Sequence, residues 1–403
     1  MKNNTVLLDD IKYIDNSVYE KIKSYTISSD DLYITVAGTI GAVGIIPEEL
    51  DGMNLTENAV KATNICIDKN YLCFVIQSDF VQNQFQDKTH HVAMPKLAIE
   101  RIQSTLIPIS PTSEQNKIVN KINSYNINTN EIQDNNEILQ NLITATKNKI
   151  LDLAIRGKLV SQNPNDEPAS ALLERIHTKK EELIKQGKLK RDKKESIIYR
   201  GDDNSYYEKF SGKPEKCIDG DLPFKIPDNW RWERIRNLFI LNPKNNIDDN
   251  MIVSFIPMAM IDDGYTGDFT YEKKPWGACK KGFTHFADGD ICFAKISPCF
   301  ENRKSALFVG LNNGYGSGTT ELYVLRRFTE DLLPEYILSF IKSEFFINRG
   351  KNTFSGVVGQ QRVDKDIILD TFIPVPSKQE QKKVYEKIQQ AFNEIEMIED
   401  CIS

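Results

Sequence analysis

The chain has 403 residues, a formal net charge of −6 and an apolar content of 40%. A chain of this length has room for two or three domains with ordinary hydrophobic cores. No stretch is apolar for long enough to cross a bilayer, and the first residues lack the pattern of a secretory signal. The seven cysteines show no CxxC pair and no zinc-ligand spacing, and histidines number only four. This composition favours reduced thiols in a cytoplasmic protein and predicts no metal site.

Residues 1–110 predict a module of mixed strands and helices. The stretch DLYITVAGTIGAVGII, residues 31–46, has the β-branched and alternating character of strands, and its glycines allow close approach of the backbone. The stretch NYLCFVIQSDFVQNQF, residues 70–85, predicts an amphipathic helix.

The pattern changes at Pro111, where a long helix is expected to begin. Thr112 or Ser113 can cap it, and Glu114 stands in its first turn. From Ile118 onward, apolar residues recur at alternating steps of four and three, as in the heptad seam of a coiled coil. Polar residues interrupt this seam and would fix its register. The helix is expected to end near Gly157, a plausible left-handed cap.

The central part of the chain, residues 161–221, predicts a turn, a short helix at Ala169–Lys185 closed by Gly187, and a polar segment that wraps over a surface. The run KKEELIKQGKLKRDKKESIIYR, residues 179–200, is basic. It is either a solvated face or a contact for phosphates or a partner. Residues 222–376 predict a second α/β module, with strands in SFIPMAMID, GDICFAKISP and ELYVLRRF and a helix in PEYILSFIKSEFFINRG.

The two halves of the chain repeat each other. A segment from Ile27 ends in IPISPTSEQNKIVNKI, residues 107–122, and a segment from Phe286 ends in IPVPSKQEQKKVYEKI, residues 373–388. Each copy is an α/β segment that leads into a helix with a heptad seam, so the two helices either pair or pack separately on their own modules. The residues predicted to pair are Ile118, Ile122, Ile132, Leu139, Ile143 and Ile150 of the first helix, and Val384, Ile388, Ile395 and Ile398 of the second.

Catalytic signatures are missing from the sequence. It contains no GxxxxGK[ST] loop for a nucleoside triphosphate, no GxGxxG after a strand, and no Asn-Pro-Pro-aromatic tetrad of adenine methyltransferases. The acidic pairs Asp248-Asp249 and Asp262-Asp263 lie in turn contexts, where carboxylates are mostly solvated. The glycine-rich stretch GLNNGYGSGT, residues 310–319, is a turn with close backbone approach or a loop that contacts nucleic acid. The chain is therefore expected not to be an enzyme.

The second module instead offers polar and basic side chains on three segments next to its strands. Arg, Lys, Asn and Gln are the residues that read base edges and clamp phosphates, although each could also be an ordinary surface residue. The candidate DNA-binding residues are Lys295, Ser297, Asn302, Arg303 and Lys304, then Ser317, Thr319 and Thr320, and finally Lys351, Asn352, Gln360, Gln361 and Arg362.

Several stretches together resemble the specificity subunit of type I restriction-modification systems. They are ILDLAIRGKLVSQNPNDEPASALLERI, KQGKLKRDKKESIIYRGDDN, IPDNWRWERI, GDICFAKISP and the two repeated helix starts. The resemblance implies an α+β fold in which two α/β target recognition domains are separated by two long helices that form an antiparallel coiled coil. It implies the following boundaries: a first recognition domain at 1–110, a central spacer helix at 111–160, a short helix and basic linker at 161–221, a second recognition domain at 222–376, and a distal spacer helix at 377–403.

The resemblance also implies function. Such a subunit recognises a bipartite sequence in double-stranded DNA and directs two methyltransferase subunits and the restriction subunits to it. It carries no cofactor, since S-adenosylmethionine, ATP and Mg²⁺ belong to the partners.

The first module departs from the family pattern, because it has only 26 residues before Ile27 where the second has a long leading segment. We therefore expect its recognition domain to be truncated at its N-terminal side. One alternative is a partial or silent specificity cassette that binds methyltransferase subunits but reads only one half-site. Another is a stand-alone nuclease or methyltransferase, against which the missing motifs count.

Overall fold

The structure is a computed structural model that describes all residues except 1–10, 12, 87–95, 357–360 and 402–403. Its contacts divide the chain into two units, Met1–Glu137 and Ile138–Ser403, which are described separately. We call residues 11–110 module 1 and residues 222–376 module 2. The division falls inside the long helix, whereas the change in sequence pattern lies at residue 110.

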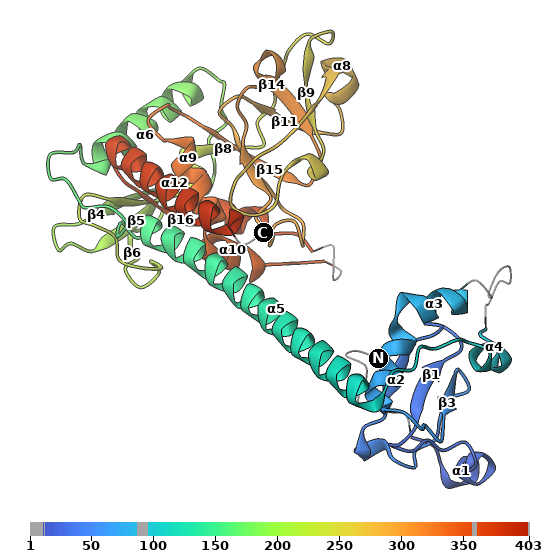
Figure 1. Ribbon diagram of the computed structural model, residues 1–403. Coiled ribbons are helices and arrows are strands. Elements are labelled where there is room, and N and C mark those ends of the chain that lie inside the picture. Colours follow the sequence, from blue (N-terminus) through green and yellow to red (C-terminus); the bar gives the residue numbers. More distant parts are fainter. Residues whose placement is uncertain (1–10, 12, 87–95, 357–360, 402–403) are drawn as a thin grey trace. The chain divides into compact units, whose positions relative to one another are not determined.

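Module 1 is a small antiparallel sheet covered by helices on one face (Figure 1). Leu32 and Ile34 alternate along the central strand and are buried against Tyr71, Val75 and Phe85 of the helices. The predicted helix at 70–85 is in fact two helices, α2 and α3, which are separated at Ser78. The elements are α1 (Asn16–Ile22), β1 (Leu32–Thr35), β2 (Val43–Ile45), β3 (Ala59–Ala62), α2 (Lys69–Gln77), α3 (Asp79–Gln86) and α4 (Ile99–Gln103), with sheet order β2-β1-β3 and a 3-10 turn at Glu48–Leu50.

The long helix α5 runs from Thr112 to Ile155, close to the predicted bounds. It ends at Gly157, whose φ is +66°, and the Lys158 N–H donates to the Leu153 carbonyl as in a left-handed helix cap. Helix α6 (Ala169–Lys185) has the predicted bounds. The next segment differs from the prediction, since residues 196–217 form an antiparallel sheet in the order β4-β5-β6, made of β4 (Ser196–Arg200), β5 (Tyr206–Phe210) and β6 (Lys216–Cys217).

Several cations of the basic run 179–200 are paired with carboxylates of this chain. Lys180 is buried and its Nζ lies 2.7 Å from Glu195 Oε1, while Arg191 pairs with Glu181 at 2.6 Å and Lys194 with Asp366 at 2.6 Å. These pairs favour a structural role for much of the run over a contact with phosphates.

Module 2 contains two four-stranded sheets that share a core. The sheet β13-β12-β15-β8 and the sheet β10-β9-β14-β11 enclose Phe286, Phe308, Leu322 and Val324. A third ladder pairs β16 with β7. The strands are β7 (Arg231–Arg234), β8 (Phe239–Leu241), β9 (Ile252–Ile256), β10 (Glu272–Pro275), β11 (Thr284–Ala287), β12 (Ile291–Ala294), β13 (Ser305–Leu307), β14 (Tyr315–Gly318), β15 (Leu322–Arg327) and β16 (Phe372–Val375).

The glycine-rich stretch 310–319 holds a 3-10 turn at Asn312–Gly314 and then strand β14. A Cβ on Gly316 would lie 2.2 Å from the ring of Phe286, and one on Gly318 would lie 2.2 Å from the carbonyl oxygen of Ile256. The glycines therefore serve the close packing of a buried strand, as the turn-with-close-approach interpretation required.

Helices cover the other face of the β12 sheet. The predicted helix at 334–350 is broken at Ser343, whose side chain accepts a hydrogen bond from the Phe346 N–H and caps the second helix. The helices of module 2 are α7 (Ile235–Leu238), α8 (Trp276–Cys279), α9 (Pro334–Lys342), α10 (Glu344–Lys351) and α11 (Lys365–Leu369), followed by α12 (Lys378–Asp400), with a 3-10 turn at Met258–Met260.

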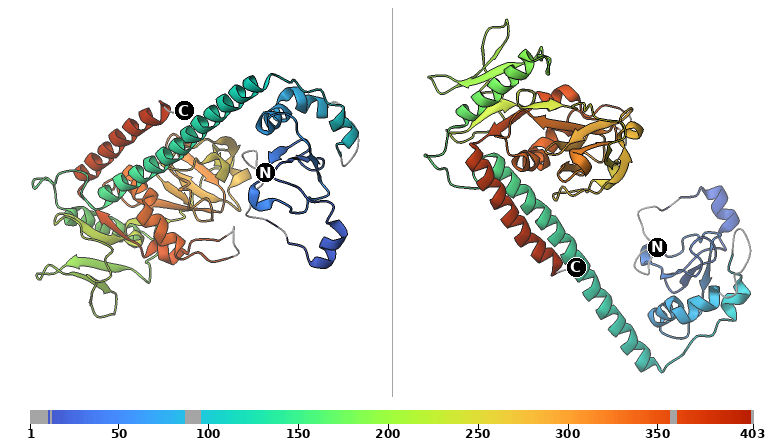
Figure 2. Two further views of the ribbon diagram at one scale, coloured as in Figure 1. Left: turned by 60° about the horizontal axis from the view of Figure 1, so that its bottom comes forward. Right: turned by 90° about the horizontal axis from the view of Figure 1, so that it is seen from above.

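In the second unit, α12 runs beside the last turns of α5 in the opposite direction (Figure 2). Lys147 Nζ of α5 lies 2.8 Å from Glu399 Oε2 near one end of α12. Near the other end, Gln162 just after α5 donates to the Glu380 carboxylate. Among the described residues, no helix has the length and apolar character that crossing a bilayer requires.

The repeated helix starts have the same structural role in both halves. In α5, the Gln115 amide donates to the Ser110 carbonyl at 2.7 Å and accepts from the Asp68 N–H at 2.9 Å. In α12, the Gln381 amide donates to the Pro376 carbonyl at 3.1 Å and accepts from the Leu333 N–H at 2.7 Å. Each glutamine thus ties its long helix to the start of another helix of its own module, which is α2 after β3 in module 1 and α9 after β15 in module 2.

Candidate DNA interface

The three candidate segments of module 2 meet at one end of the β12–β15 ladder. The Lys295 N–H donates to the Glu321 carbonyl at 2.9 Å, and its own carbonyl accepts from the Val363 N–H at 2.9 Å. The Ser297 N–H donates to the Gln361 carbonyl at 2.8 Å. Backbone hydrogen bonds therefore hold the three segments together, although helices α9 and α10 lie between the second and the third in the sequence.

A charged pair lies across this junction. Arg362 Nε and Nη2 each donate at 2.9 Å to the Glu321 carboxylate, which is a two-point contact. The hydrogen bond and charge of Arg362 lower the pKa of Glu321, and the same contact raises the pKa of Arg362. The Arg362 side chain is 47% exposed, so its guanidinium is ordered and still faces solvent. Such an arginine is preorganised for the flat acceptor edge of a base or for a phosphate.

Lys295 stands next to this pair. Its ammonium lies 5.6 Å from the centre of the Tyr323 ring, and it contributes to the lowered pKa of Glu321. Thr320 is exposed directly before Glu321, and the Thr319 hydroxyl accepts from the Glu321 N–H at 3.2 Å. The junction formed by Lys295, Thr320, Glu321, Gln361 and Arg362 is called the loop junction below.

Two of the predicted DNA-binding residues lie inside the module. Ser297 is 7% exposed, and Ser317 is fully buried on β14, where its hydroxyl has no hydrogen-bond partner. Ser297 lies in a turn after β12, and Ser317 lies on β14, a strand that is buried along most of its length. Their proposed DNA contacts would require the module to open.

Arg303 and Lys304 face the protein rather than the loop junction. Arg303 Nη2 donates to Asn148 Oδ1 of α5 at 2.9 Å, Nε donates to the Lys342 carbonyl, and the guanidinium lies 4.9 Å from the Tyr265 ring. Lys304 Nζ donates to the Ile261 carbonyl at 2.5 Å. These contacts give both residues a structural role that their charge in the sequence did not indicate.

The remaining candidates are exposed. Asn302 and Asn352 are on the surface, and Lys351 lies 3.3 Å from Glu301. Gln360 falls outside the described residues. Sequence reasoning missed Glu321. The signal for it was its position, since it is a polar residue directly before the apolar strand β15 and directly after the candidate residue Thr320.

The predicted helix-pairing residues divide into groups. Ile143, Val384, Ile388 and Ile395 are buried, with Leu139 and Ile150 partly so, along the stretch where α5 and α12 run together. Ile118 and Ile122 are partly buried, and Ile118 packs into the core of module 1. Ile132 is 60% exposed and Ile398 is 52% exposed, so among the described residues the paired seam is shorter than the set of residues predicted to pair.

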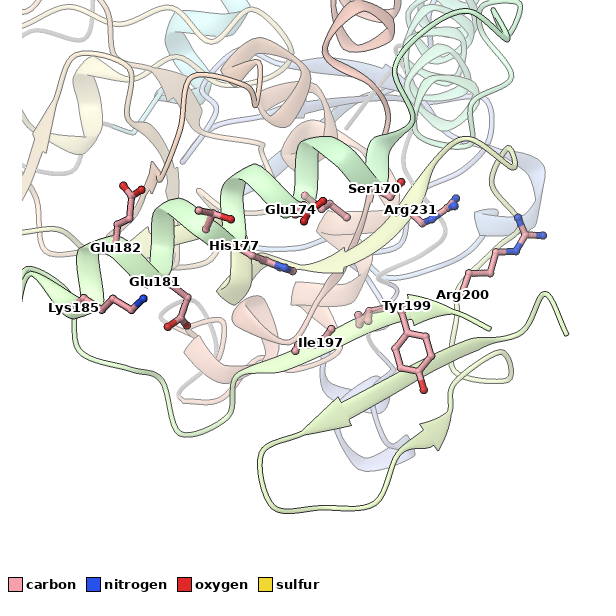
Figure 3. Close-up of a pocket in the computed structure, with 13 residues that line it drawn as sticks. Ser170, Glu174, His177, Glu181, Glu182, Lys185, Ile197, Tyr199, Arg200 and Arg231 are labelled. Atoms are coloured by element: carbon pink, nitrogen blue, oxygen red, sulfur yellow. The ribbon is translucent and has the colours of Figure 1, made fainter. Parts of the chain in front are cut away.

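A separate cavity of about 750 Å³ lies between α6 and β4 (Figure 3). His177 Nε2 is 3.1 Å from the buried carboxylate of Glu233, which also accepts from the side chain of Asn237. The contacts of His177 and Asn237 thus satisfy the buried carboxylate of Glu233. Within the part of the chain that the structure describes, no group of histidine, cysteine or acidic residues could hold a metal ion.

The architecture is an α+β fold that contains related modules joined through long helices. A sequence model described as the type I restriction modification DNA specificity domain matches residues 2–140 and 234–402, one region in each half. Since these regions make up most of the chain, the protein belongs to this family.

Individual relatives agree with this assignment. The chain is 42% identical over 251 residues to the specificity subunit of the type I restriction enzyme EcoAI from Escherichia coli. The aligned stretch covers 62% of this chain and 39% of that protein. The chain is 43% identical over 236 residues to the EcoEI specificity subunit of the same organism, 58% of this chain and 36% of that protein. The chain thus spans well under half the length of these relatives.

A solved structure shares the fold. Its description reads "structural basis underlying complex assembly and conformational transition of the type I R-M system". The TM-score is 0.54 at 15% identity, over 93% of this chain and 77% of that one.

Proposed function

We propose that this chain is the sequence-specific DNA recognition subunit of a type I restriction-modification complex. It would direct methyltransferase and restriction subunits to a bipartite site in double-stranded DNA and perform no chemistry itself. The observation that carries the proposal is the loop junction, where three polar segments meet around an ordered, solvent-facing Arg362 in a chain of the DNA specificity family.

The mechanism follows from how these side chains are held. Glu321 fixes the plane of the Arg362 guanidinium before DNA arrives, so less side-chain entropy is lost on binding. The Glu321 carboxylate also repels phosphates, so non-matching DNA gains little from Arg362. Matching DNA gains more, because a base edge replaces or joins the contact with Glu321. Lys295 supplies a neighbouring positive charge for the backbone.

The proposal extends to partners, cofactors and location. The long helices would position the partner subunits, and S-adenosylmethionine, ATP and Mg²⁺ would be bound by those partners and not by this chain. A complex that acts on DNA of the cell would be cytoplasmic.

The experiment compares target and non-target duplexes bound to the complex of this chain with its methyltransferase. Arg362→Ala should weaken binding to the target by about 1–3 kcal/mol and leave non-target binding nearly unchanged, because a base contact is lost. The matched control is Lys209→Ala, which removes an exposed cation on β5, away from the loop junction.

Glu321→Gln should act in the opposite direction on discrimination. Removing the carboxylate removes a negative charge that repels phosphates, so non-target affinity should rise and its dependence on log salt should steepen by about one phosphate contact. Equal discrimination between target and non-target DNA in wild type and both variants would take the loop junction out of the recognition site.

A further inference from the structure

Module 2 is attached to the two long helices through a buried apolar core near the end of α5 and the first turns of α12. Leu151 and Ile155 of α5 and Ile388 of α12 belong to this core, together with Tyr336 and Phe340 of α9. Burial of apolar surface is non-directional, whereas hydrogen bonds are directional. Polar contacts at this boundary therefore bear most directly on the angle between the module and the helices.

One such polar contact lies on α5 just ahead of the core. Asn148, three residues before Leu151, accepts at Oδ1 from the Tyr265 hydroxyl at 2.7 Å and from Arg303 Nη2 at 2.9 Å. Tyr265 and Arg303 belong to different loops of module 2, one before β10 and one between β12 and β13. A single side chain of the helix thus binds two loops of the module. We call these two hydrogen bonds the Asn148 contact.

Tyr265 also contacts both long helices. Its ring meets the ring of Phe392 of α12 edge to face, with 5.7 Å between the ring centres, and Lys147 Nζ of α5 lies 5.8 Å from the centre of the Tyr265 ring. Loss of hydration raises the pKa of Tyr265, so its hydroxyl keeps the proton that it donates to Asn148. Tyr265 therefore joins module 2 to the helix pair and not to one helix alone.

The two loops are held by further contacts of module 2. Arg303 has a φ of +59°, which L residues rarely adopt, and its Nε donates to the Lys342 carbonyl at 2.9 Å. Lys342 Nζ in turn donates to the carbonyl of Gly264, the neighbour of Tyr265, at 2.7 Å. An uncommon backbone conformation that the surroundings hold in place is a frequent sign of function. Here it accompanies a guanidinium that is directed at α5.

We infer that the Asn148 contact holds module 2 at one angle on the long helices and thereby fixes the number of base pairs between the two half-sites. This role rests on the proposed function, and it makes Asn148, Tyr265 and Arg303 positioning residues that do not touch DNA. One base pair more or less shifts a half-site by about 3.4 Å and turns it by about 35° around the duplex. The module must change its angle to follow, and the Asn148 contact must open.

Opening of the contact lowers the affinity for DNA with the wrong gap. Such a duplex binds only the opened form, so it loses the factor that the contact contributes to the closed form. Two hydrogen bonds, one of them from a charged guanidinium, correspond to about ten-fold or more. Asn148→Leu removes both bonds with little change in side-chain size, so the preference for the correct gap should fall by about this factor. The bases read in each half-site should stay the same, because the contact lies away from the loop junction.

The test uses the complex of the full chain with its methyltransferase. Initial rates of methyl transfer are compared on duplexes that carry the wild-type half-sites with the gap found for wild type, or with one base pair added or removed. Asn148→Asp keeps an acceptor of the same shape and should keep the wild-type gap preference. Tyr265→Phe loses one of the two bonds and should lie between wild type and Asn148→Leu. The control is Asn141→Leu, which changes an exposed residue one heptad earlier on α5 and should behave as wild type.

The failures of the two proposals are distinguishable. An unchanged gap preference in Asn148→Leu, in a complex that still selects its half-sites, would overturn the role of the contact and leave the proposed function standing. Equal relaxation in Asn148→Leu and Asn148→Asp, or in Asn141→Leu, would also overturn it, because the effect would then not depend on the acceptor. Methylation by the wild-type complex that ignores the half-sites would overturn the proposed function, and this role with it.

Discussion

Lys342 shows how burial of a single side chain changes its chemistry. It is 3% exposed, and its Nζ donates to the carbonyls of Gly264, Ser305 and Arg303 at 2.7 to 3.2 Å. Loss of hydration lowers the pKa of Lys342 from 10.5 to about 7. This titratable side chain therefore joins α9 to the start of β13 and to the loop at Gly264.

The pKa of Lys342 predicts a pH dependence of stability. Between about pH 7 and 10.5 the unfolded chain holds this proton and the folded chain does not, so the free energy of unfolding should rise with pH. One proton contributes at most about 1.4 kcal/mol per pH unit. Lys342→Met should flatten this rise in urea unfolding curves at pH 7, 8 and 9. The exposed Lys365→Met should keep it, and parallel curves for wild type and Lys342→Met would refute the assignment.

Residue type was a good guide to which segments form the loop junction and a poor guide to individual side chains. Lys295 and Arg362 lie at the junction, as the pattern of basic residues after strands indicated. The contacts of Arg303 could not be predicted, because its direction depends on a backbone φ of +59° and on a partner in α5, Asn148, that is far away in sequence. The burial of Ser317 could not be predicted, because the glycine-rich segment around it reads as a loop but forms a buried strand.

At the scale of elements, the end of α5 requires glycine at position 157 for two reasons. Its φ of +66° suits glycine, and a Cβ there would lie 2.5 Å from the ring of Pro227. Gly157→Ala should therefore destabilise the chain by about 2–4 kcal/mol, the sum of backbone strain and the contact. Gly187→Ala is the control, since φ is +70° and nothing lies within 4 Å, so only about 1–2 kcal/mol is expected. Equal shifts of the thermal midpoint would show that the end of α5 does not depend on Pro227.

Because α12 pairs with the end of α5, an aspartate introduced into α12 should lower stability by an amount that depends on its position along the helix. Ile388 is 1% exposed, so Ile388→Asp should cost more than about 3 kcal/mol and loosen α12. Ile398 is 52% exposed, and Ile398→Asp should change stability by less than about 1 kcal/mol. Limited proteolysis of α12 together with thermal unfolding measures both. Similar behaviour of the two variants would contradict the pairing.

Long periodic elements were predictable, and short strands with irregular patterns were not. The bounds of α5 and α6 followed from heptad spacing, Pro111 and two glycines with positive φ. The sheet at 196–217 was missed because charged and polar residues surround its few buried positions, such as Ile198 and Tyr206. The helices at 70–85 and 334–350 were each predicted as one because a single serine breaks them, at Ser78 and Ser343.

At the scale of the whole molecule, the duplication explains both what is shared and what differs. Gln115 and Gln381 make matching contacts, so each module is attached to its long helix in the same way. Module 2 has a second four-stranded sheet, whereas the described part of module 1 has at the corresponding place a bridge between Thr26 and Asn54.

The central claim is that this chain gives a type I complex its DNA sequence preference. Methylome sequencing of cells that express the chain with its methyltransferase tests it most directly. A bipartite methylated motif is predicted in wild type, and Arg362→Ala should degrade one half of it while the other half and the gap persist. A methylation pattern without any motif, or one that Arg362→Ala leaves untouched in both halves, would contradict the account.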